Sequence, residues 1–269
     1  LSILAVINAI LLRSAYTTLA QRQASYPTWL RNVRSRQFIM STIYVGGCAF
    51  RSILPCHHTL RRALVGCYAS TGFVGRCVAT IAELGAADQA GLLLREIGHA
   101  TNDGVITFLS YLMVPLLVSA ELFSWYACVT TNYIGSIVEE SLWAMCAFLS
   151  IVALLRCYNE YVGREQRDFI HKALTLNMVY FTYMVSVDVP NYIKGHIANT
   201  TDGTSYYNLI DGLKTLINIT EHKITWSYED WRYAMCWMTL YFSIACWSSI
   251  GVVNAPRMDM GLARQKIVG

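Results

Sequence analysis

An arginine, a threonine and a glutamate share one face of an otherwise apolar stretch of the chain. Arg76, Thr80 and Glu83 are spaced i, i+4 and i+7, which places them on a single stripe of a helix. Small residues flank this stripe: Gly72, Gly75, Ala79 and Ala82. A second helix can therefore approach closely. The stripe is either an ion-paired packing face, the interpretation that we prefer, or a site for a proton or a substrate.

A second polar stripe crosses a later apolar stretch and comprises Asn132, Ser136, Glu139, Glu140 and Trp143. Successive residues of a helix point in different directions, so Glu139 and Glu140 cannot both face the same neighbour. We expect one of them to pair with Arg76 or Arg51, and the other to lie near the rim or to carry a proton. Two carboxyl groups held close together can act as a general acid and base. Pairing for structure is nevertheless the interpretation that we prefer.

Ionisable side chains within membrane-length apolar segments are costly. At the centre of a bilayer each one costs at least ~2.5–3.5 kcal/mol. Such residues must face a protein interior, a partner or water, and Arg76 should lie within ion-pair distance of an acid. We therefore predict a buried charge network of seven residues: Arg51, Arg76, Glu83, Glu121, Glu139, Glu140 and Asp188.

Metal-binding patterns are incomplete. Glu96 and His99 form an ExxH pair, but carboxylate-bridged di-iron bundles use two such pairs, and His99 is expected at a helix C-terminus. The Cys-His-His triplet at 56–58 is interpreted as a solvated interfacial loop rather than a metal site. The nine cysteines form no CxxC pair, which disfavours a disulfide framework or a zinc site. We predict no metal and no cofactor. An enzyme would draw its catalytic residues from Glu83, Glu139, Glu140 and His99.

Seven apolar segments must position these side chains. They are residues 1–20, 38–54, 63–94, 105–128, 133–155, 169–187 and 234–253. A helix of about 20 residues crosses the ~30 Å hydrocarbon core. The third segment is longer and would tilt strongly or continue beyond the bilayer. We predict an all-α, polytopic integral membrane bundle with six to seven transmembrane helices.

The composition agrees with this class. Hydrophobic residues make up 55% of the 269 residues and charged residues only 14%, whereas roughly 25% of a soluble domain is charged. The net charge is +4, and no dense run of Lys and Arg with interleaved aromatic residues is present. Nucleic acid is therefore excluded as a partner. The chain begins at Leu1 inside an apolar run, and we expect an upstream segment such as a cleaved organellar presequence.

The distribution of cationic residues predicts the topology. If the segments alternate, residues 21–37, 99–104, 156–168 and the C-terminal tail share one side, with ten Lys and Arg residues against five opposite. That bias places this side in the cytosol, matrix or stroma. Cationic loops also attract anionic lipid headgroups. The residues expected to bind them are Arg31, Arg34, Arg36, Arg164 and Arg167.

A single domain spanning residues 1–269 is expected, with an interfacial helical insertion at about 190–231. Pro190 is predicted to end the preceding helix. Apolar residues between 207 and 217 recur at helical spacing, which favours an amphipathic helix at the interface. The insertion also contains two glycosylation sequons, at Asn199 and Asn218, which would be used only in the secretory pathway.

Three short patches resemble an uncharacterised family of multi-pass membrane proteins. The first two are residues 75–83 (GRCVATIAE) and residues 131–143 (TNYIGSIVEESLW). The third lies between 230 and 242 and comprises DWR at 230–232, WM at 237–238 and YF at 241–242. The patches cover about 30 residues. The resemblance implies a membrane fold and no catalytic activity.

Three classes of function remain open. The preferred one is a non-catalytic accessory subunit of a larger membrane complex, with other membrane subunits and phospholipids, anionic ones included, as partners. We expect it in an energy-transducing organellar membrane, the mitochondrial inner membrane first, with the secretory pathway as the alternative. The other classes are an intramembrane enzyme that uses buried carboxylates, and a transporter or channel with a polar interior.

Overall fold

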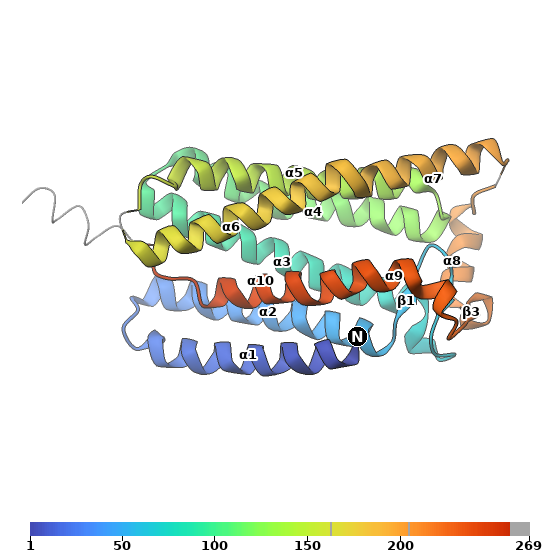
Figure 1. The fold of residues 1–269 in the computed structure, drawn as a ribbon, viewed down its shortest axis with the longest axis horizontal. Coiled ribbons are helices and arrows are strands. Elements are labelled where there is room, and N and C mark those ends of the chain that lie inside the picture. Colours follow the sequence, from blue (N-terminus) through green and yellow to red (C-terminus); the bar gives the residue numbers. More distant parts are fainter. Residues whose placement is uncertain (162, 204, 259–269) are drawn as a thin grey trace, which may run out of the picture.

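Long helices packed side by side make up most of the molecule (Figure 1). The computed structural model describes residues 1–161, 163–203 and 205–258. Within these residues the α-helices are α1 (Ser2–Gln23), α2 (Thr28–Ile53), α3 (Gly72–Thr101), α4 (Gly104–Thr130), α5 (Tyr133–Cys157), α6 (Arg164–Tyr183), α7 (Val189–Thr201), α8 (Leu209–Ile217), α9 (Tyr228–Leu240) and α10 (Cys246–Val253). The prediction of a helical bundle is confirmed at this level.

A small sheet interrupts the helical architecture at one end of the bundle. Its strands are β1 (Cys56–His57), β2 (Arg62–Ala63) and β3 (Lys223–Ile224). Strand β2 pairs antiparallel with β1 and parallel with β3. The sheet therefore joins the loop after α2 to the segment before α9, a contact that helical periodicity could not predict.

Four of the described helices are long and apolar enough to cross a membrane: α1, α3, α4 and α5. Residues 237–253 form a shorter apolar helical stretch. Helix α2 is less apolar because Arg31, Arg34 and Arg36 lie in its first half. Helix α6 begins with a charged turn at Arg164. The six to seven crossings predicted from the sequence are thus supported for four helices only.

The apolar segment at 63–94 is not one helix, contrary to the prediction. Its first residues form β2 and a 3-10 turn at Tyr68–Ser70, and α3 begins only at Gly72. The Thr71 hydroxyl caps α3 by accepting the Val74 N–H at 3.3 Å. Such a cap satisfies one of the free N–H groups of the first turn. A hydropathy pattern cannot distinguish this apolar loop from the helix that follows it.

Pro190 does not end its helix, and that prediction was wrong. A π turn at Met184–Asp188 connects α6 directly to α7, which continues to Thr201. In this turn the Val189 N–H bonds to the Met184 carbonyl, five residues earlier. Proline lacks an N–H and clashes with the carbonyl four residues back in a regular helix, so a wider turn accommodates it. A second π turn, Tyr241–Ala245, joins α9 to α10.

The insertion is therefore shorter than predicted, because α7 belongs to the long helix. Helix α8 and β3 lie at the end of the bundle in Figure 1. Arg61 fixes them there. Its buried guanidinium donates to the carbonyls of Cys128 (2.8 Å), Val129 (3.2 Å) and Gly212 (3.2 Å), and also to that of His58. A cation at the C-terminus of α4 satisfies the last carbonyls of that helix.

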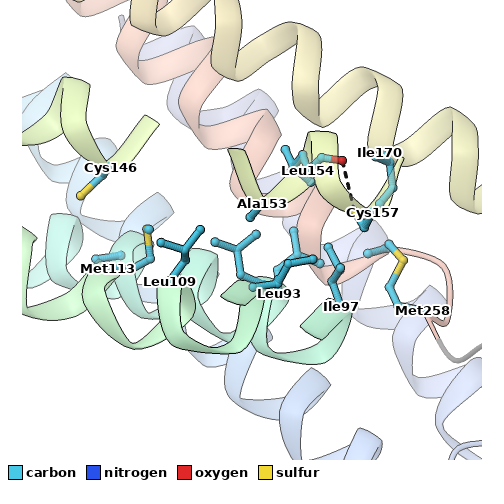
Figure 2. Packing of buried hydrophobic residues seen from close by; sticks show 14 of the residues in the cluster. Leu93, Ile97, Leu109, Met113, Cys146, Ala153, Leu154, Cys157, Ile170 and Met258 are labelled. Atoms are coloured by element: carbon cyan, nitrogen blue, oxygen red, sulfur yellow. Dashed lines mark hydrogen bonds between the residues drawn. The ribbon is translucent and has the colours of Figure 1, made fainter. Parts of the chain in front are cut away.

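One apolar core lies between α3, α4, α5 and α6 (Figure 2). Ile97, Ile106 and Ile170 are fully buried there. Met258, beyond α10, closes the core, and the Tyr161 hydroxyl donates to its carbonyl at 2.9 Å. The chain after α10 therefore packs against the α5–α6 connection, at the end of the bundle opposite α8.

A second core joins α1, α2 and the α9–α10 run. Phe242, Met238 and Cys246 are fully buried in it. A polar contact reinforces this packing, because the Asn8 amide donates to the Phe242 carbonyl at 2.7 Å. The two cores lie on either side of α3, whose small and charged residues face both.

The beginning of α3 depends on a neutral histidine. His222, which lies outside the long helices, accepts the Gly72 N–H on Nε2 at 3.0 Å, and its Nδ1 contacts the Asn218 carbonyl at 2.9 Å. Both contacts are satisfied only when Nε2 is unprotonated. Burial lowers the pKa of His222 below its ordinary value of about 6.5.

Acidification is therefore expected to weaken the fold through His222. Below about pH 6.5 the unfolded chain takes up a proton that the folded chain resists, so the free energy of unfolding falls as the pH falls. His222→Ala should lower the melting midpoint at pH 7.5 and reduce the further loss between pH 7.5 and 5.5. A variant whose pH dependence matches that of the unsubstituted chain would contradict this role.

Candidate functional site

Arg76 lies at the centre of a buried polar cluster. Its Nη2 contacts Glu83 Oε2 at 2.5 Å and Glu121 Oε2 at 2.6 Å. Its Nη1 donates to the Ser124 hydroxyl at 2.6 Å and lies 3.6 Å from Glu139 Oε1. The Arg76 side chain thus joins α3 to α4 and α5, and only 5% of the residue is exposed.

Glu83 connects the cluster to the other side of the bundle. Its Oε1 accepts a hydrogen bond from the Tyr241 hydroxyl at 2.8 Å and lies 3.6 Å from Nη1 of Arg51. The Arg51 guanidinium lies 5.7 Å from the ring centres of both Tyr241 and Phe242, within the range of a cation–π contact. Helix α2 and the second π turn are therefore joined to the same carboxylate.

Thr80 completes the stripe predicted on α3. Its hydroxyl donates to Glu121 Oε2 and accepts the Trp125 indole N–H at 3.1 Å. The side chain of Arg76 also contacts this hydroxyl, at 3.3 Å. The threonine thus aligns the Glu121 carboxyl group from the same helix face that carries Arg76.

The predicted network is assembled in part. Ion pairs connect five of the seven residues: Arg51, Arg76, Glu83, Glu121 and Glu139. Glu140 and Asp188 are close enough to one another to interact electrostatically. No ion pair to either of them is found among the described residues. Asp188 is the last residue of the first π turn, so both π turns face the cluster.

The network lies in the half of the bundle nearest α8. Arg76 is four residues from the start of α3, Glu139 six residues from the start of α5, and Glu121 nine residues from the end of α4. At ~1.5 Å per residue these positions lie about 6–14 Å from the helix ends. Arg76, Glu121 and Glu139 therefore lie away from the centre of their helices, where burial would cost most, and Glu83, eleven residues from the start of α3, lies deeper.

Arg34 belongs to a different buried site, so its assignment to lipid headgroups is corrected. The residue is 0% exposed. Its guanidinium donates to Glu96 Oε1 and Gln37 Oε1, both at 2.8 Å, and to the carbonyls of Val252 and Pro256. This site holds the end of α10 against α2 and α3. Glu96 thus serves an ion pair, not the ExxH metal pair.

The other arginines expected at lipid headgroups are exposed. Arg36 forms a bidentate pair with Asp88, and Arg31 donates to the Tyr26 carbonyl at 3.5 Å. Arg164 and Arg167 line a surface cavity together with Tyr158, Asp168 and His171. A second cavity, at the α8 end, is lined by Tyr126, Thr130 and residues 207–211. No member of the Arg76 network lines either cavity.

His99 is distant from the other residues named for an enzyme. It is exposed in the last turn of α3, sixteen residues beyond Glu83, or ~24 Å along the helix. The set of Glu83, Glu139, Glu140 and His99 is therefore not brought together. Among the described residues, no group of three or more His, Cys, Asp or Glu side chains is arranged to hold a metal ion.

Cys56 and His58 are buried and His57 is half-buried, contrary to the expectation of a solvated loop at 56–58. Cys56 is in β1, and the ring of His58 packs against α3 so tightly that a Cβ at Gly75 would lie 2.8 Å from its Cε1. Within the described part of the chain, neither ring nitrogen of His58 has a hydrogen-bond partner. Burial, and then the nearby Arg51 and Arg76, lower the pKa of His58 well below its usual range.

Sequence reasoning missed Tyr241 as a member of the network. The residue was noted only as part of an aromatic pair, and nothing in a 3.6-residue period indicates that a π turn will direct its hydroxyl towards α3.

The geometry as a whole can do two things: lock five helical elements together, or hold a proton among several carboxyl groups. In comparisons with protein-family models, curated proteins and solved structures, none matches this chain.

Proposed function

We propose that the chain is a non-catalytic, multi-pass membrane protein that serves as a structural subunit of a larger membrane assembly. The single observation that carries the proposal is the Arg76 network. Its charges are paired directly inside the chain, across α2, α3, α4, α5 and the second π turn. A transport path or a substrate site would require access to these groups, and neither of the two surface cavities described above is lined by them.

Exposed apolar surface supports the membrane assignment. Large apolar side chains on α1 are exposed, including Ile3, Val6 and Ile10. In the proposed topology α1, α2, α3, α4, α5, the α6–α7 run and the α9–α10 run each cross the bilayer. The exposed Arg164 and Arg167 would then contact anionic phospholipids near the interface. An energy-transducing organellar membrane remains the preferred location.

Replacing Glu139 and Glu140 by Gln tests the proposal. A structural subunit should then assemble less well, because Arg76 loses one of its three carboxylate contacts. The yield of the native complex is expected to fall several-fold, while the activity per complex stays unchanged. Both quantities are measured on complexes purified from the native membrane.

The matched control is the double variant Glu160→Gln and Glu165→Gln, which neutralises two exposed acids. It should assemble normally. If the Glu139 and Glu140 variant instead assembled in normal yield and lost an activity of the complex, the structural proposal would be overturned.

A proton-linked enzyme or transporter is the second candidate. One observation favours it: both π turns present a polar group, Asp188 or Tyr241, towards the buried carboxyl groups. Such turns occur frequently at functional sites. The same double variant separates this candidate from the first, because loss of turnover with normal assembly is its expected result.

A further inference from the structure

Two carboxyl groups of the network compete for one nitrogen. Glu83 Oε2 and Glu121 Oε2 lie 2.5 Å and 2.6 Å from Nη2 of Arg76. Because both oxygens contact the same nitrogen, the two carboxyl groups are direct neighbours, and each acts electrostatically on the other. Carboxylates at such separation in a buried site cannot both ionise without a large repulsion. A proton on one of the two carboxyl groups removes that repulsion.

The charges around the pair do not balance without such a proton. Three carboxylates (Glu83, Glu121 and Glu139) are paired with two guanidiniums, Arg51 and Arg76. One proton on this group makes its net charge zero.

Other groups near the pair add no cation. They are Glu140 of α5, Asp188, Tyr180 and Tyr192 of the α6–α7 run, Tyr44 of α2, Tyr241 of the second π turn, Cys128 of α4, and His58 of the loop after α2. His58 is held neutral by burial and by the two arginines. Arg61 is engaged with backbone carbonyls.

An unpartnered oxygen locates the proton. Glu121 is 4% exposed, and its Oε1 has no hydrogen-bond partner among the residues that the structure describes. Its Oε2 already accepts from Arg76 and Thr80, which fixes the carboxyl group inside the cluster. Glu83, by contrast, contacts Arg76, Arg51 and Tyr241. Glu83 is thus the better stabilised anion, and a bare anionic Oε1 on Glu121 would be costly.

We propose that Glu83 and Glu121 form a proton-binding pair, in which Glu121 is the carboxylic acid and Glu83 the carboxylate. The ligand is a single proton taken from water. This inference goes beyond the structural role proposed above, and it holds whether or not the chain is a subunit of an assembly.

Infrared spectroscopy of the purified full chain in lipid nanodiscs tests the proposal. At neutral pH the spectrum should contain a carboxylic-acid C=O stretching band that shifts on exchange into D2O. Glu121→Gln should remove part of that band, whereas Glu160→Gln, at an exposed position, should leave it intact. Glu140 can contribute its own band, so the quantity measured is the intensity lost relative to the unsubstituted chain.

A second variant keeps the test valid if Glu121→Gln fails to fold. Thr80→Val removes the hydroxyl that donates to Glu121 Oε2 and should shift the same component of the band. The proposal is overturned if Glu121→Gln folds and the band keeps its full intensity, or if Thr80→Val leaves every component in place. The proton would then lie on another carboxyl group of the network. Because the isolated chain is used, this result is independent of the assembly test.

Discussion

Replacing Arg76 with alanine is expected to destabilise the protein more than any other single substitution considered. The guanidinium contacts carboxylates from three helices. Its removal leaves Glu121 and Glu139 without a cation in a buried site and leaves Glu83 with Arg51 alone. Loss of one partner of a buried ion pair costs about 3–5 kcal/mol, a large part of the ~5–15 kcal/mol by which a domain is stable. The yield of monodisperse protein in detergent and its melting midpoint measure the effect.

The matched comparison removes the acids together with the arginine. Arg76→Ala combined with Glu121→Gln and Glu139→Gln should recover part of the yield, because fewer unpaired charges remain buried. Arg13→Ala, at an exposed position on α1, should be close to neutral. A single Arg76→Ala variant as stable as the unsubstituted chain would contradict the role of the network, as would a triple variant no better than the single one.

Arg34→Ala is expected to have the second largest effect, and Arg36 provides an internal control two residues away. The Arg34–Glu96 pair measures 2.8 Å and both side chains are 1% exposed. Arg36 pairs with Asp88 at 2.6 Å, but its side chain is 55% exposed. We expect Arg34→Ala to cost about 3–5 kcal/mol and Arg36→Ala about 0–1 kcal/mol.

Thermal unfolding of the two variants side by side measures this difference. Arg34→Ala should also expose residues 254–258 to proteolysis, because Arg34 binds the Val252 and Pro256 carbonyls. Equal melting midpoints for the two variants would show that the depth of burial does not decide the strength of these pairs.

The sequence predicted the helices well where apolar length and polar spacing agree. The α4 and α5 segments were placed to within two residues at each end, because turn residues that can cap a helix, Asp103 and Asn132, precede them. The hydropathy pattern predicted a membrane segment that includes residues 63–71, but these residues form β2 and a loop before α3. Proline rules failed at Pro190, because they assume a regular α-helix up to that position.

The site was predictable from the sequence only in part. The spacing of Arg76 and Glu83 requires them to share a helix face, and the cost of buried charge requires partners. Neither argument identifies which helix supplies the partner, so Glu121, Glu139 and Glu140 were equivalent candidates. Arg34 was assigned to an exposed, headgroup-binding position because its buried partner, Glu96, lies far away in sequence.

The π turns change how the chain should be aligned with any other. A π turn contains one residue more than the α-helical turn it replaces, and each residue of an α-helix rotates the next by about 100°. Everything beyond Met184–Asp188 and Tyr241–Ala245 is therefore out of phase with the helix before it. A homologue that lacks the extra residue would present a different face of α7 or α10 to its neighbours, even if every remaining residue were identical. In a sequence alignment, a single-residue gap at either position would therefore indicate a change in how the helices pack, and not only a change in chain length.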